Sequence, residues 1–246
     1  MLMLAYRSGI FPMADSRDDP DIFWVEPNLR AILPLDGFHC SRSLARTLRR
    51  GRFRVTCNAA FARVMGECAA PRRDIDGTGE SWISRRIFAS YLELHRLGHA
   101  HSIECWQGDR LVGGLYGVGF DRVFCGESMF SRETDASKVA LAWLVAALRR
   151  CRAELLDCQF MTAHLSSLGS VEISQDRYVA LLAQAQRPYA LGAASGVGDA
   201  AGEAGAAFAG GAPLALPAGF AAVLAAAGGS SSSPGNFIAQ SLTQTS

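Results

Sequence analysis

The stretch that decides the fold begins Ser102-Ile-Glu-Cys-Trp-Gln107, turns at Gly-Asp, and continues Arg110-Leu-Val-Gly-Gly-Leu-Tyr-Gly-Val-Gly-Phe120. A Gly-Asp pair between two such segments, both holding aromatic and β-branched residues, favours a hairpin. A third short strand is expected at 122–125. The stretch therefore predicts an antiparallel sheet at the centre of the protein.

Helices are expected on both sides of this hairpin. A helix that begins at Ser81 or Ser84 precedes the strands, with apolar residues at helical spacing. Asp135 is expected to cap a long helix after them, and a short strand at 155–160 and a helix at 175–186 follow. This order predicts an α+β (mixed α/β) fold, in which helices cover a hairpin-built sheet.

The part of the chain ahead of the hairpin is shorter and rich in arginine. Ser41 is expected to cap a helix that ends at Arg50, and Asn58 to cap a second one. The predicted domains are residues 1–70, a small N-terminal domain; 71–190, the larger domain; and 191–246, an Ala/Gly/Ser-rich tail expected to be flexible.

Composition excludes several classes of protein. The 246 residues include 24 basic and 23 acidic ones, which excludes a globally basic coat protein. Seven cysteines without a Cys-x-x-Cys pair argue against a disulfide framework and a zinc knuckle. The sequence shows neither an export signal nor a spanning apolar run, so we expect a cytoplasmic protein without membrane contact.

Positive charge is concentrated near the N-terminus. Between Asp36 and Glu67 there is no acidic residue. The arginines of this window are Arg42, Arg46, Arg49, Arg50, Arg52, Arg54 and Arg63. Two interpretations stay open: a solvated basic helix face, or a surface that follows nucleic-acid phosphates, for which the planar arginine fork is suited.

Three motifs resemble known sites only in part. The glycines from Gly114 to Gly119 lie inside an expected strand with no helix directly after them, so close approach of other groups is favoured over a dinucleotide loop. Ser128 lies in Gly-Glu-Ser-Met-Phe, where Phe130 replaces the closing glycine of a nucleophile elbow. The histidines at 95, 99 and 101 lack the spacing of a zinc motif.

Two acidic residues at strand ends are the stronger candidates. Glu127 follows an apolar strand, so its carboxylate must find a partner or a ligand. Asp157 and Gln159 share one face of a period-2 strand, where an acid and an amide can orient an amine. A buried, satisfied polar cluster is the alternative, and Cys158 near His164 is weak evidence for thiol catalysis.

Taken together, these segments resemble the leucyl/phenylalanyl-tRNA–protein transferase family over about residues 2–187. The matching stretches are Ala5-Tyr-Arg-Ser-Gly-Ile-Phe-Pro12, Trp82-Ile83, Leu94-His-Arg-Leu-Gly-His-Ala-His-Ser-Ile-Glu-Cys-Trp106, Leu111-Val-Gly-Gly-Leu-Tyr-Gly-Val118, Phe124-Cys-Gly-Glu-Ser-Met-Phe-Ser131, Ala136-Ser-Lys138, Leu156-Asp-Cys-Gln159, His164 and Ser167-Leu-Gly169. The resemblance implies transfer of Leu, Phe or Met from aminoacyl-tRNA to the N-terminal Arg or Lys of an acceptor protein, which marks the acceptor for N-end-rule degradation. It also implies an acetyltransferase-like larger domain at 71–190, no metal or coenzyme, and a monomer.

The resemblance also distributes roles among residues. The candidate residues are Asp157, Gln159 and Glu127 for catalysis; Trp82, Leu115, Ser128, Phe130 and His164 for substrate binding; and Arg42, Arg46, Arg49, Arg50 and Arg54 for tRNA binding. Asp157 would orient the attacking amine or take charge from it, and Leu115 with Trp82 would hold the apolar side chain.

The sequence departs from the family pattern in several places. Members usually have roughly 30 further residues ahead of Ala5, so part of the N-terminal domain is expected to be absent or mis-assigned. Asp135 stands where an Asn is usual, and Thr162 where an amide is frequent. Two other functions stay open: an acyl-coenzyme-A N-acetyltransferase, which needs a pyrophosphate loop that the residues before Asp135 lack, and a non-catalytic RNA-binding module.

Overall fold

The structure, a computed structural model, describes residues 1–70, 81–187, 211–229 and 233–243. In chain order the elements are α1 (Leu2–Arg7), β1 (Phe11–Met13), β2 (Phe23–Val25), β3 (Leu29–Ile32), α2 (Arg42–Arg49), β4 (Arg54–Cys57), α3 (Phe61–Cys68), α4 (Arg85–Arg96), β5 (Ala100–Gln107), β6 (Arg110–Phe120), β7 (Val123–Ser131), α5 (Ala136–Arg150), β8 (Leu155–Gln159), α6 (Ala163–Ser166), β9 (Val171–Ser174), α7 (Gln175–Ala185), α8 (Leu216–Gly228) and α9 (Pro234–Thr243). Of the expected tail, residues 191–210, 230–232 and 244–246 lie outside these ranges.

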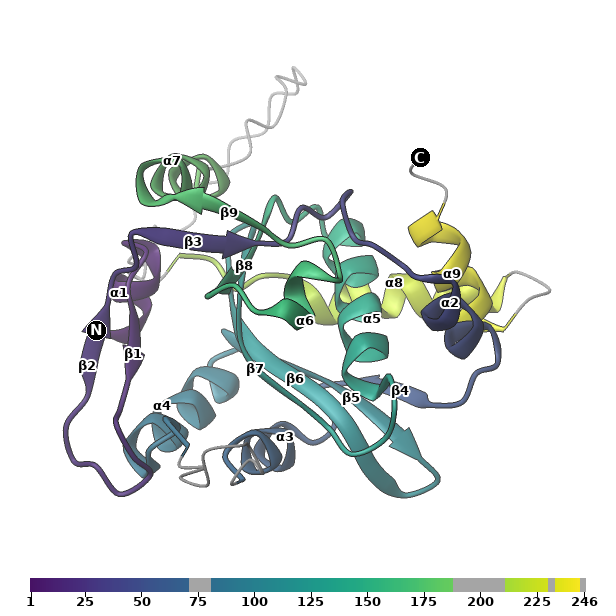
Figure 1. Cartoon of the computed structure of the whole chain (residues 1–246), viewed down its shortest axis with the longest axis horizontal. Helices are drawn as coiled ribbons and strands as arrows, with labels where there is room; N and C mark the ends of the chain where they lie inside the picture. Colours follow the sequence, from purple (N-terminus) through teal and green to yellow (C-terminus); the bar gives the residue numbers. More distant parts are fainter. Residues whose placement is uncertain (71–80, 188–210, 230–232, 244–246) are drawn as a thin grey trace, which may run out of the picture.

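A seven-stranded mixed sheet forms the centre of the molecule, in the order β4-β5-β6-β7-β8-β3-β9 (Figure 1). Neighbouring strands are antiparallel except β7 and β8, which run parallel. The predicted α+β class is confirmed, while the likeness to acetyltransferases stays a prediction. Because β3 and β4 belong to this sheet, it takes strands from both sides of the boundary expected at residue 70.

Helices cover the two faces of the sheet in different ways. The long helix α5 packs on one face, and α3 and α4 pack on the other (Figure 1). Two adjacent glycines of β6 serve close approach: a Cβ at Gly113 would overlap Ala136 of α5, and one at Gly114 would overlap the carbonyl oxygen of Ile103 on β5. These glycines therefore let a helix and a neighbouring strand approach β6, as favoured above over a phosphate loop.

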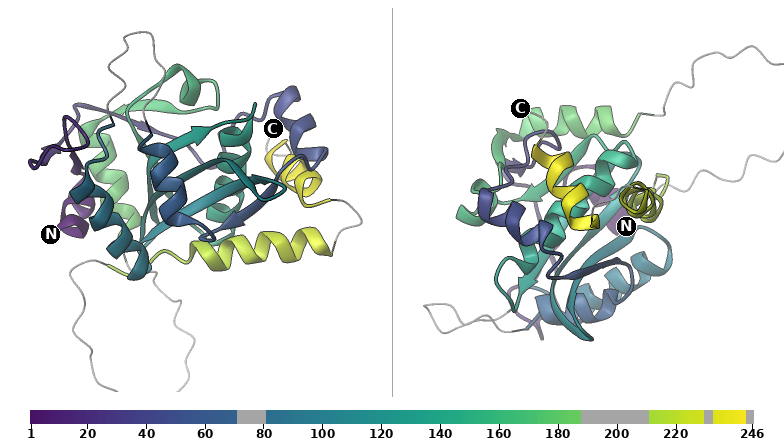
Figure 2. Two further views of the ribbon diagram at one scale, coloured as in Figure 1. Left: turned by 90° about the horizontal axis from the view of Figure 1, so that it is seen from below. Right: turned by 90° about the vertical axis from the view of Figure 1, so that its right-hand side faces the viewer.

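The expectation of a flexible tail is wrong for α8 and α9. Leu216, Phe220 and Val223 of α8 are buried, and the Phe220 ring lies 5.4 Å from that of Trp143 on α5. Helix α9 lies beside α2 in both views of Figure 2. Apolar residues placed among the alanines provide a packing face, which the Ala/Gly/Ser composition conceals.

Two expected helix caps are confirmed and two are wrong. Ser41 and Ser84 accept hydrogen bonds from the backbones of α2 and α4. Asn58 instead has φ +60° and accepts from the Ser102 backbone at 3.0 Å, so it ties the start of α3 to β5. Asp135 precedes α5 with φ +69° and makes no cap bond, but accepts from Thr47 at 3.1 Å.

Strand β7 continues to Ser131, six residues beyond its expected end, so Glu127 and Ser128 lie within the strand. This extension places both residues beside the open end of β8. Within the described residues, no helix is both long and apolar enough to cross a membrane.

Candidate active site

A cavity opens where the two parallel strands separate. β7 and β8 pair only from Val123 with Leu155 to Cys125 with Asp157. The residues that follow on both strands line a cavity of about 480 Å³. Its lining residues are Met13, Trp82, Leu115, Tyr116, Gly126, Glu127, Ser128, Met129, Leu141, Leu144, Leu156, Cys158, Gln159, Phe160, Thr162, His164 and Leu165. Ligands commonly bind at the carboxyl ends of parallel strands, where this cavity lies.

The lining of the cavity has an apolar part, called its floor below, and a polar part, called its rim. The floor combines Leu115 of β6, Leu141 and Leu144 of α5, and Leu156 of β8. The polar groups are the side chains of Glu127, Ser128, Gln159, Thr162 and His164. Such a surface favours a ligand with one apolar group and a few hydrogen-bonding atoms.

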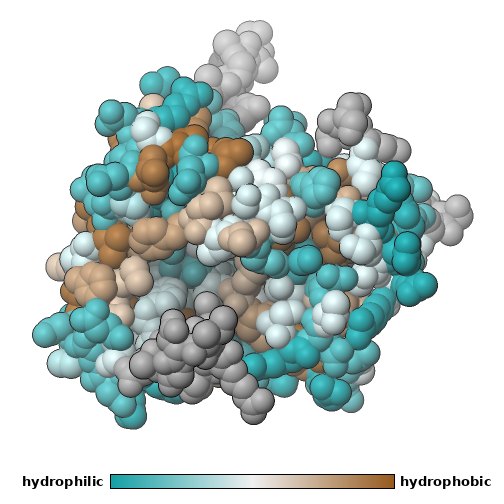
Figure 3. Space-filling model, viewed as in Figure 1, coloured by the Kyte–Doolittle hydropathy of each residue, from teal (hydrophilic) through white to brown (hydrophobic). Residues whose placement is uncertain are grey.

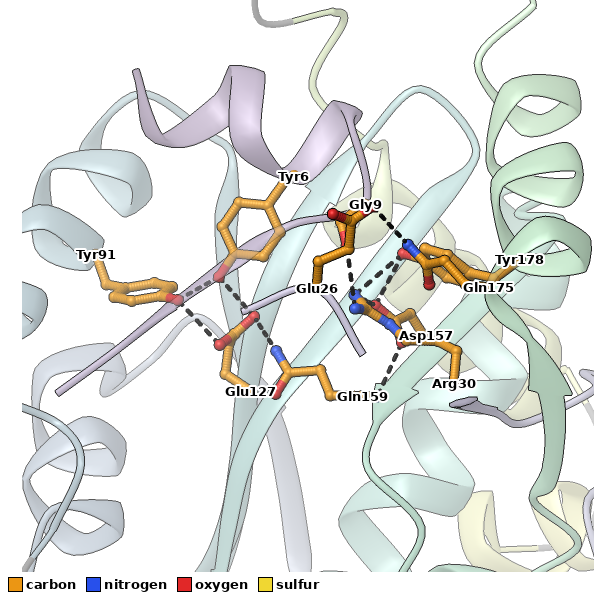
Figure 4. A network of polar contacts seen from close by, with 10 residues as sticks. All are labelled: Tyr6, Gly9, Glu26, Arg30, Tyr91, Glu127, Asp157, Gln159, Gln175 and Tyr178. Atoms are coloured by element: carbon orange, nitrogen blue, oxygen red, sulfur yellow. Dashed lines mark hydrogen bonds and ion pairs between the residues drawn. The ribbon is translucent and has the colours of Figure 1, made fainter. Parts of the chain in front are cut away.

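Glu127 is buried and is held by neutral donors (Figure 4). Its Oε1 accepts from the Tyr6 hydroxyl at 2.7 Å and from the Gln159 amide at 3.0 Å. Its Oε2 accepts from the Tyr91 hydroxyl at 2.9 Å, and the two phenols also contact each other. α1, α4 and β8 thus each contribute one donor to a single carboxyl group.

Burial raises the pKa of Glu127 to about 7, against the opposing effect of its three hydrogen bonds. The nearby Asp157 charge raises the pKa further. Burial also raises the pKa of Tyr6 and of Tyr91, so both phenols stay protonated donors at neutral pH. Glu127 therefore changes its charge near neutral pH, a property that many acid–base groups of active sites share.

Asp157 forms a buried ion pair with Arg30. The guanidinium of Arg30 donates to both of its oxygens, from Nε at 2.9 Å and from Nη2 at 2.6 Å, and neither side chain is exposed. Tyr178 donates to Oδ2 at 3.0 Å (Figure 4). The Phe11 and Tyr178 rings flank the guanidinium. The bidentate pair joins β3 and β8, and the Tyr178 hydroxyl adds α7.

Asp157 also fixes the backbone of Gln159. Its Oδ1 accepts the Gln159 amide hydrogen at 2.8 Å, and Gln159 has φ +62°, a region that residues other than glycine seldom occupy. The hydrogen bond stabilises this conformation, and the side chain of Gln159 then lies at the cavity and reaches Glu127. Gln159 thus couples the two carboxyl groups, because its backbone amide donates to Asp157 and its side-chain amide donates to Glu127.

The structure brings together most of the residues proposed from the sequence. Trp82, Leu115, Ser128 and His164 line the cavity with Glu127 and Gln159. Burial lowers the pKa of His164, and its buried Nε2 has no hydrogen-bond partner among the described residues.

Two proposed residues do not line the cavity. Phe130 lies near the far end of β7, opposite Gly114 of β6, and packs in the apolar cluster that contains α3. The carboxylate of Asp157 is fully buried by its partners. Neither side chain is therefore placed to contact a substrate directly.

Sequence reasoning missed four residues of the network: Tyr6, Arg30, Tyr91 and Tyr178. Each comes from an element distant in sequence from β7 and β8. Arg30 had one detectable signal, because it is a lone charge directly ahead of the apolar run 31–35. Its pairing with Asp157 depends on the β3–β8 contact, which periodicity alone does not predict.

The weaker motifs have structural explanations. Burial raises the pKa of Cys158 to about 12, so its thiol is protonated at neutral pH and is a poor nucleophile. Ser128 lies inside a strand and not at a strand-to-helix turn. The described residues contain no group of three His, Cys, Asp or Glu side chains that could hold a metal, and His95 stacks on Phe61 at 4.2 Å.

The proposed tRNA-binding arginines divide into two places. Arg42, Arg46 and Arg49 of α2 and Arg50, which directly follows it, are exposed and line a second cavity of about 440 Å³. Within the described part of the chain none of the four has an ion pair. Arg54 is exposed on β4 and lies over the Trp106 ring at 5.2 Å. The edge of the molecule that carries α2 is hydrophilic in the space-filling view (Figure 3).

The protein combines an α+β sheet, an apolar cavity, coupled carboxyl groups and a separate cationic surface. This combination suits an enzyme that holds an apolar group of a polyanionic substrate. The comparisons with known proteins agree. The family model for the leucyl/phenylalanyl-tRNA protein transferase matches residues 32–183, and the model for the N-terminal domain of that family matches residues 1–28.

Relatives with the same name are similar over most of the chain. The leucyl/phenylalanyl-tRNA–protein transferase of Novosphingobium aromaticivorans is 68% identical over 255 aligned residues, which cover 100% of this chain and 95% of the relative. That of Rhizorhabdus wittichii is 58% identical, covering 82% of this chain and 78% of the relative. The chain belongs to the leucyl/phenylalanyl-tRNA–protein transferase family and is an aminoacyltransferase.

Proposed function

We propose that the protein transfers Leu, and also Phe or Met, from aminoacyl-tRNA to the N-terminal Arg or Lys of acceptor proteins. The observation that carries this proposal is the cavity between β7 and β8, where an apolar floor meets Glu127 and Gln159. The reaction is attack of a neutral α-amine on an aminoacyl ester, so the site must hold both groups in contact.

The floor of the cavity would hold the amino-acid side chain. Leu115, Leu141 and Leu156 offer apolar surface without a charged partner for a polar side chain. Side chains unbranched at Cβ would enter such a pocket, and Ile and Val would fit poorly because both of their γ-branches lie close to the backbone. Trp82 and Phe160 would cover the opening of the cavity.

The rim would hold the reacting amines. Glu127 would accept a hydrogen bond from an ammonium or amine of the substrate, and Gln159 beside it would orient the attacking nitrogen. Asp157 would act as a positioning residue, since its carboxylate holds the Gln159 backbone and does not reach the cavity. Most of the acceleration would then come from placement of the amine against the ester.

The exposed face of α2 would bind the tRNA phosphates. One apolar cluster around α5 contains Leu44 and Leu48 of α2 and also Leu165 of α6, which lines the cavity. Helix α2 and this side of the cavity therefore pack against the same core. A tRNA end placed in the cavity would need cationic partners along its backbone, and the four arginines of α2 offer them.

A transfer assay tests the proposed reaction. The enzyme is mixed with leucyl-tRNA or valyl-tRNA and with a peptide that begins with Arg or, as control, with Glu. We expect transfer from leucyl-tRNA to the Arg peptide, and roughly 10- to 200-fold less from valyl-tRNA, the discrimination that an apolar pocket provides. Equal transfer of Leu and Val, or equal use of both peptides, would contradict the proposal.

A salt titration tests the arginine surface. Replacement of Arg49 and Arg50 by Ala should weaken tRNA binding and reduce the salt slope by about one unit for each lost phosphate contact. The matched control is Arg96→Ala, because Arg96 is an exposed arginine whose partner is Glu93. An unchanged slope in the double variant would place the tRNA elsewhere.

Coenzyme A binding tests the rival reaction. An acyl-coenzyme-A acetyltransferase would be stabilised by coenzyme A in a thermal-shift experiment, since binding to the native state raises the melting temperature. We expect no shift with coenzyme A.

A further inference from the structure

We propose that helix α9 is a brace that positions the arginine helix α2 for tRNA binding, with Gly235 and Ser233 as its positioning residues. The inference rests on the proposed role of α2 in tRNA binding. It adds a function for a part of the chain that lies beyond residue 183, where the match to the family model ends.

Gly235 permits the close approach of the two helices. It is buried, and a Cβ at this position would overlap the carbonyl oxygen of Leu48, in the last turn of α2. Backbone meets backbone here, so no side chain can rotate away to make room. Ile238, Ala239 and Leu242 continue the buried face of α9 within the apolar cluster that contains Leu48.

Ser233 joins the ends of both helices. Its hydroxyl accepts from the Asn236 backbone at 3.3 Å, at the start of α9, and donates to the Arg49 carbonyl at 3.5 Å. One side chain therefore serves as a cap for α9 and as a partner for a carbonyl in the last turn of α2.

The opposite end of α9 is fixed by an arginine of α5. Arg149 donates from Nη1 to the Ser241 carbonyl at 3.0 Å and from Nε to the Leu35 carbonyl at 2.7 Å. Leu35 precedes α2 in the chain. Arg149 thus links the last turn of α9 to the segment ahead of α2.

The chemistry of α9 suits a support for a cationic surface. No residue from Ser233 to Thr243 carries a charged side chain. The helix can therefore pack against α2 without neutralising its arginines. Thr243 lines the same cavity as Arg42, Arg46 and Arg49, so the end of α9 forms part of the arginine surface itself.

The test compares two donors in variants of the full chain. The first donor is leucyl-tRNA, and the second is a leucyl ester of adenosine, which has no acceptor-stem phosphates. The variants are Gly235→Ala and the milder Ser233→Ala. The control is Gly228→Ala in α8, where an added Cβ would meet nothing within 4 Å.

We expect Gly235→Ala to raise the KM for leucyl-tRNA roughly tenfold with little change in kcat, as when binding that is equal in the ground and transition states is lost. Transfer from the adenosine ester should stay unchanged. Ser233→Ala should have a smaller effect of the same kind, and it replaces Gly235→Ala as the test if that variant does not fold. Gly228→Ala should behave as the wild type.

Two results would overturn the brace alone. One is a wild-type KM for leucyl-tRNA in the Gly235→Ala variant, provided that the double variant Arg49→Ala/Arg50→Ala does bind tRNA more weakly. The other is an equal loss with both donors, which would make α9 a general stabiliser of the fold. If the double arginine variant binds tRNA normally, the proposed role of α2 fails instead, and the brace fails with it.

Discussion

Glu127 on β7 and Asp157 on β8 are both buried carboxyl groups on adjacent strands, but their partners differ in kind. Asp157 faces the guanidinium of Arg30 in a bidentate ion pair. Glu127 receives only neutral donors, from two tyrosines and one amide. Only Glu127 lines the cavity.

From this difference we propose that one sheet separates support from chemistry. A buried charge with a counter-ion has its desolvation largely offset, so it can lock elements together in one charge state. A buried carboxyl group without a counter-ion is costly when ionised, so its pKa rises toward the pH at which the enzyme works. On this view Asp157 organises the site and Glu127 takes part in it.

Removal of the counter-ion is the largest expected perturbation. Arg30→Met leaves the Asp157 carboxylate buried and unpaired, which should lower the free energy of unfolding by about 3–5 kcal/mol. Urea unfolding measures this change. The control is Arg85→Met, because Arg85 pairs with Asp18 on the exposed surface, where such pairs contribute about 0–1 kcal/mol. Similar losses in both variants would contradict the distinction drawn above.

Asp157→Asn tests whether the lock also supports catalysis. The substitution removes the charge that holds Arg30 and weakens the hydrogen bond to the Gln159 backbone, so the amide at the cavity loses its position. Single-turnover transfer should fall by roughly 10²–10⁴-fold, while tRNA affinity stays near that of the wild type at temperatures below melting. A stable variant with full transfer activity would remove Asp157 from the account.

Glu127 should make stability depend on pH. Its pKa is about 7 in the folded protein and about 4.3 when unfolded, so the native state binds the proton more tightly between these values. Stability from this group is therefore full below about pH 4.3, declines as pH rises, and is lost above about pH 7, a change on the order of 3 kcal/mol. Glu127→Gln should lack this decline.

The measurement is the difference in unfolding free energy between the wild type and Glu127→Gln, taken by urea unfolding at pH 5, 6, 7 and 8. Subtraction removes the contributions of other titrating groups. A difference that stays constant with pH would show that Glu127 has an ordinary pKa and no special environment.

Local patterns predicted the centre of the fold. The hairpin of β5 and β6 turns at Gly108 with φ +60°, and α5 follows β7, as their residue patterns indicated. The two C-terminal helices were missed because their apolar residues are dispersed among Ala, Gly and Ser. Composition carried no information about the helices that this segment would meet.

The site was predictable on its own strands but not across the fold. Glu127 and Gln159 could be singled out because polar residues at the ends of apolar strands require partners. The partners themselves, such as Tyr6 and Arg30, come from the N-terminal part of the chain and depend on long-range packing. Phe130 does not line the cavity because the sheet register places it opposite Gly114, and sequence spacing does not reveal that register.

The central claim is that Glu127 takes part in the transfer reaction. A comparison of two buried glutamates tests this claim most directly. Glu104 on β5 is also fully buried and hydrogen-bonded, to Ser102, Thr56 and the start of α3, but it does not line the cavity. Single-turnover transfer from leucyl-tRNA is measured for Glu127→Gln and Glu104→Gln, normalised to the folded fraction. The account predicts a loss of roughly 10²-fold or more for Glu127→Gln and wild-type transfer for Glu104→Gln. Wild-type transfer by Glu127→Gln, or an equal loss in both variants, would contradict it.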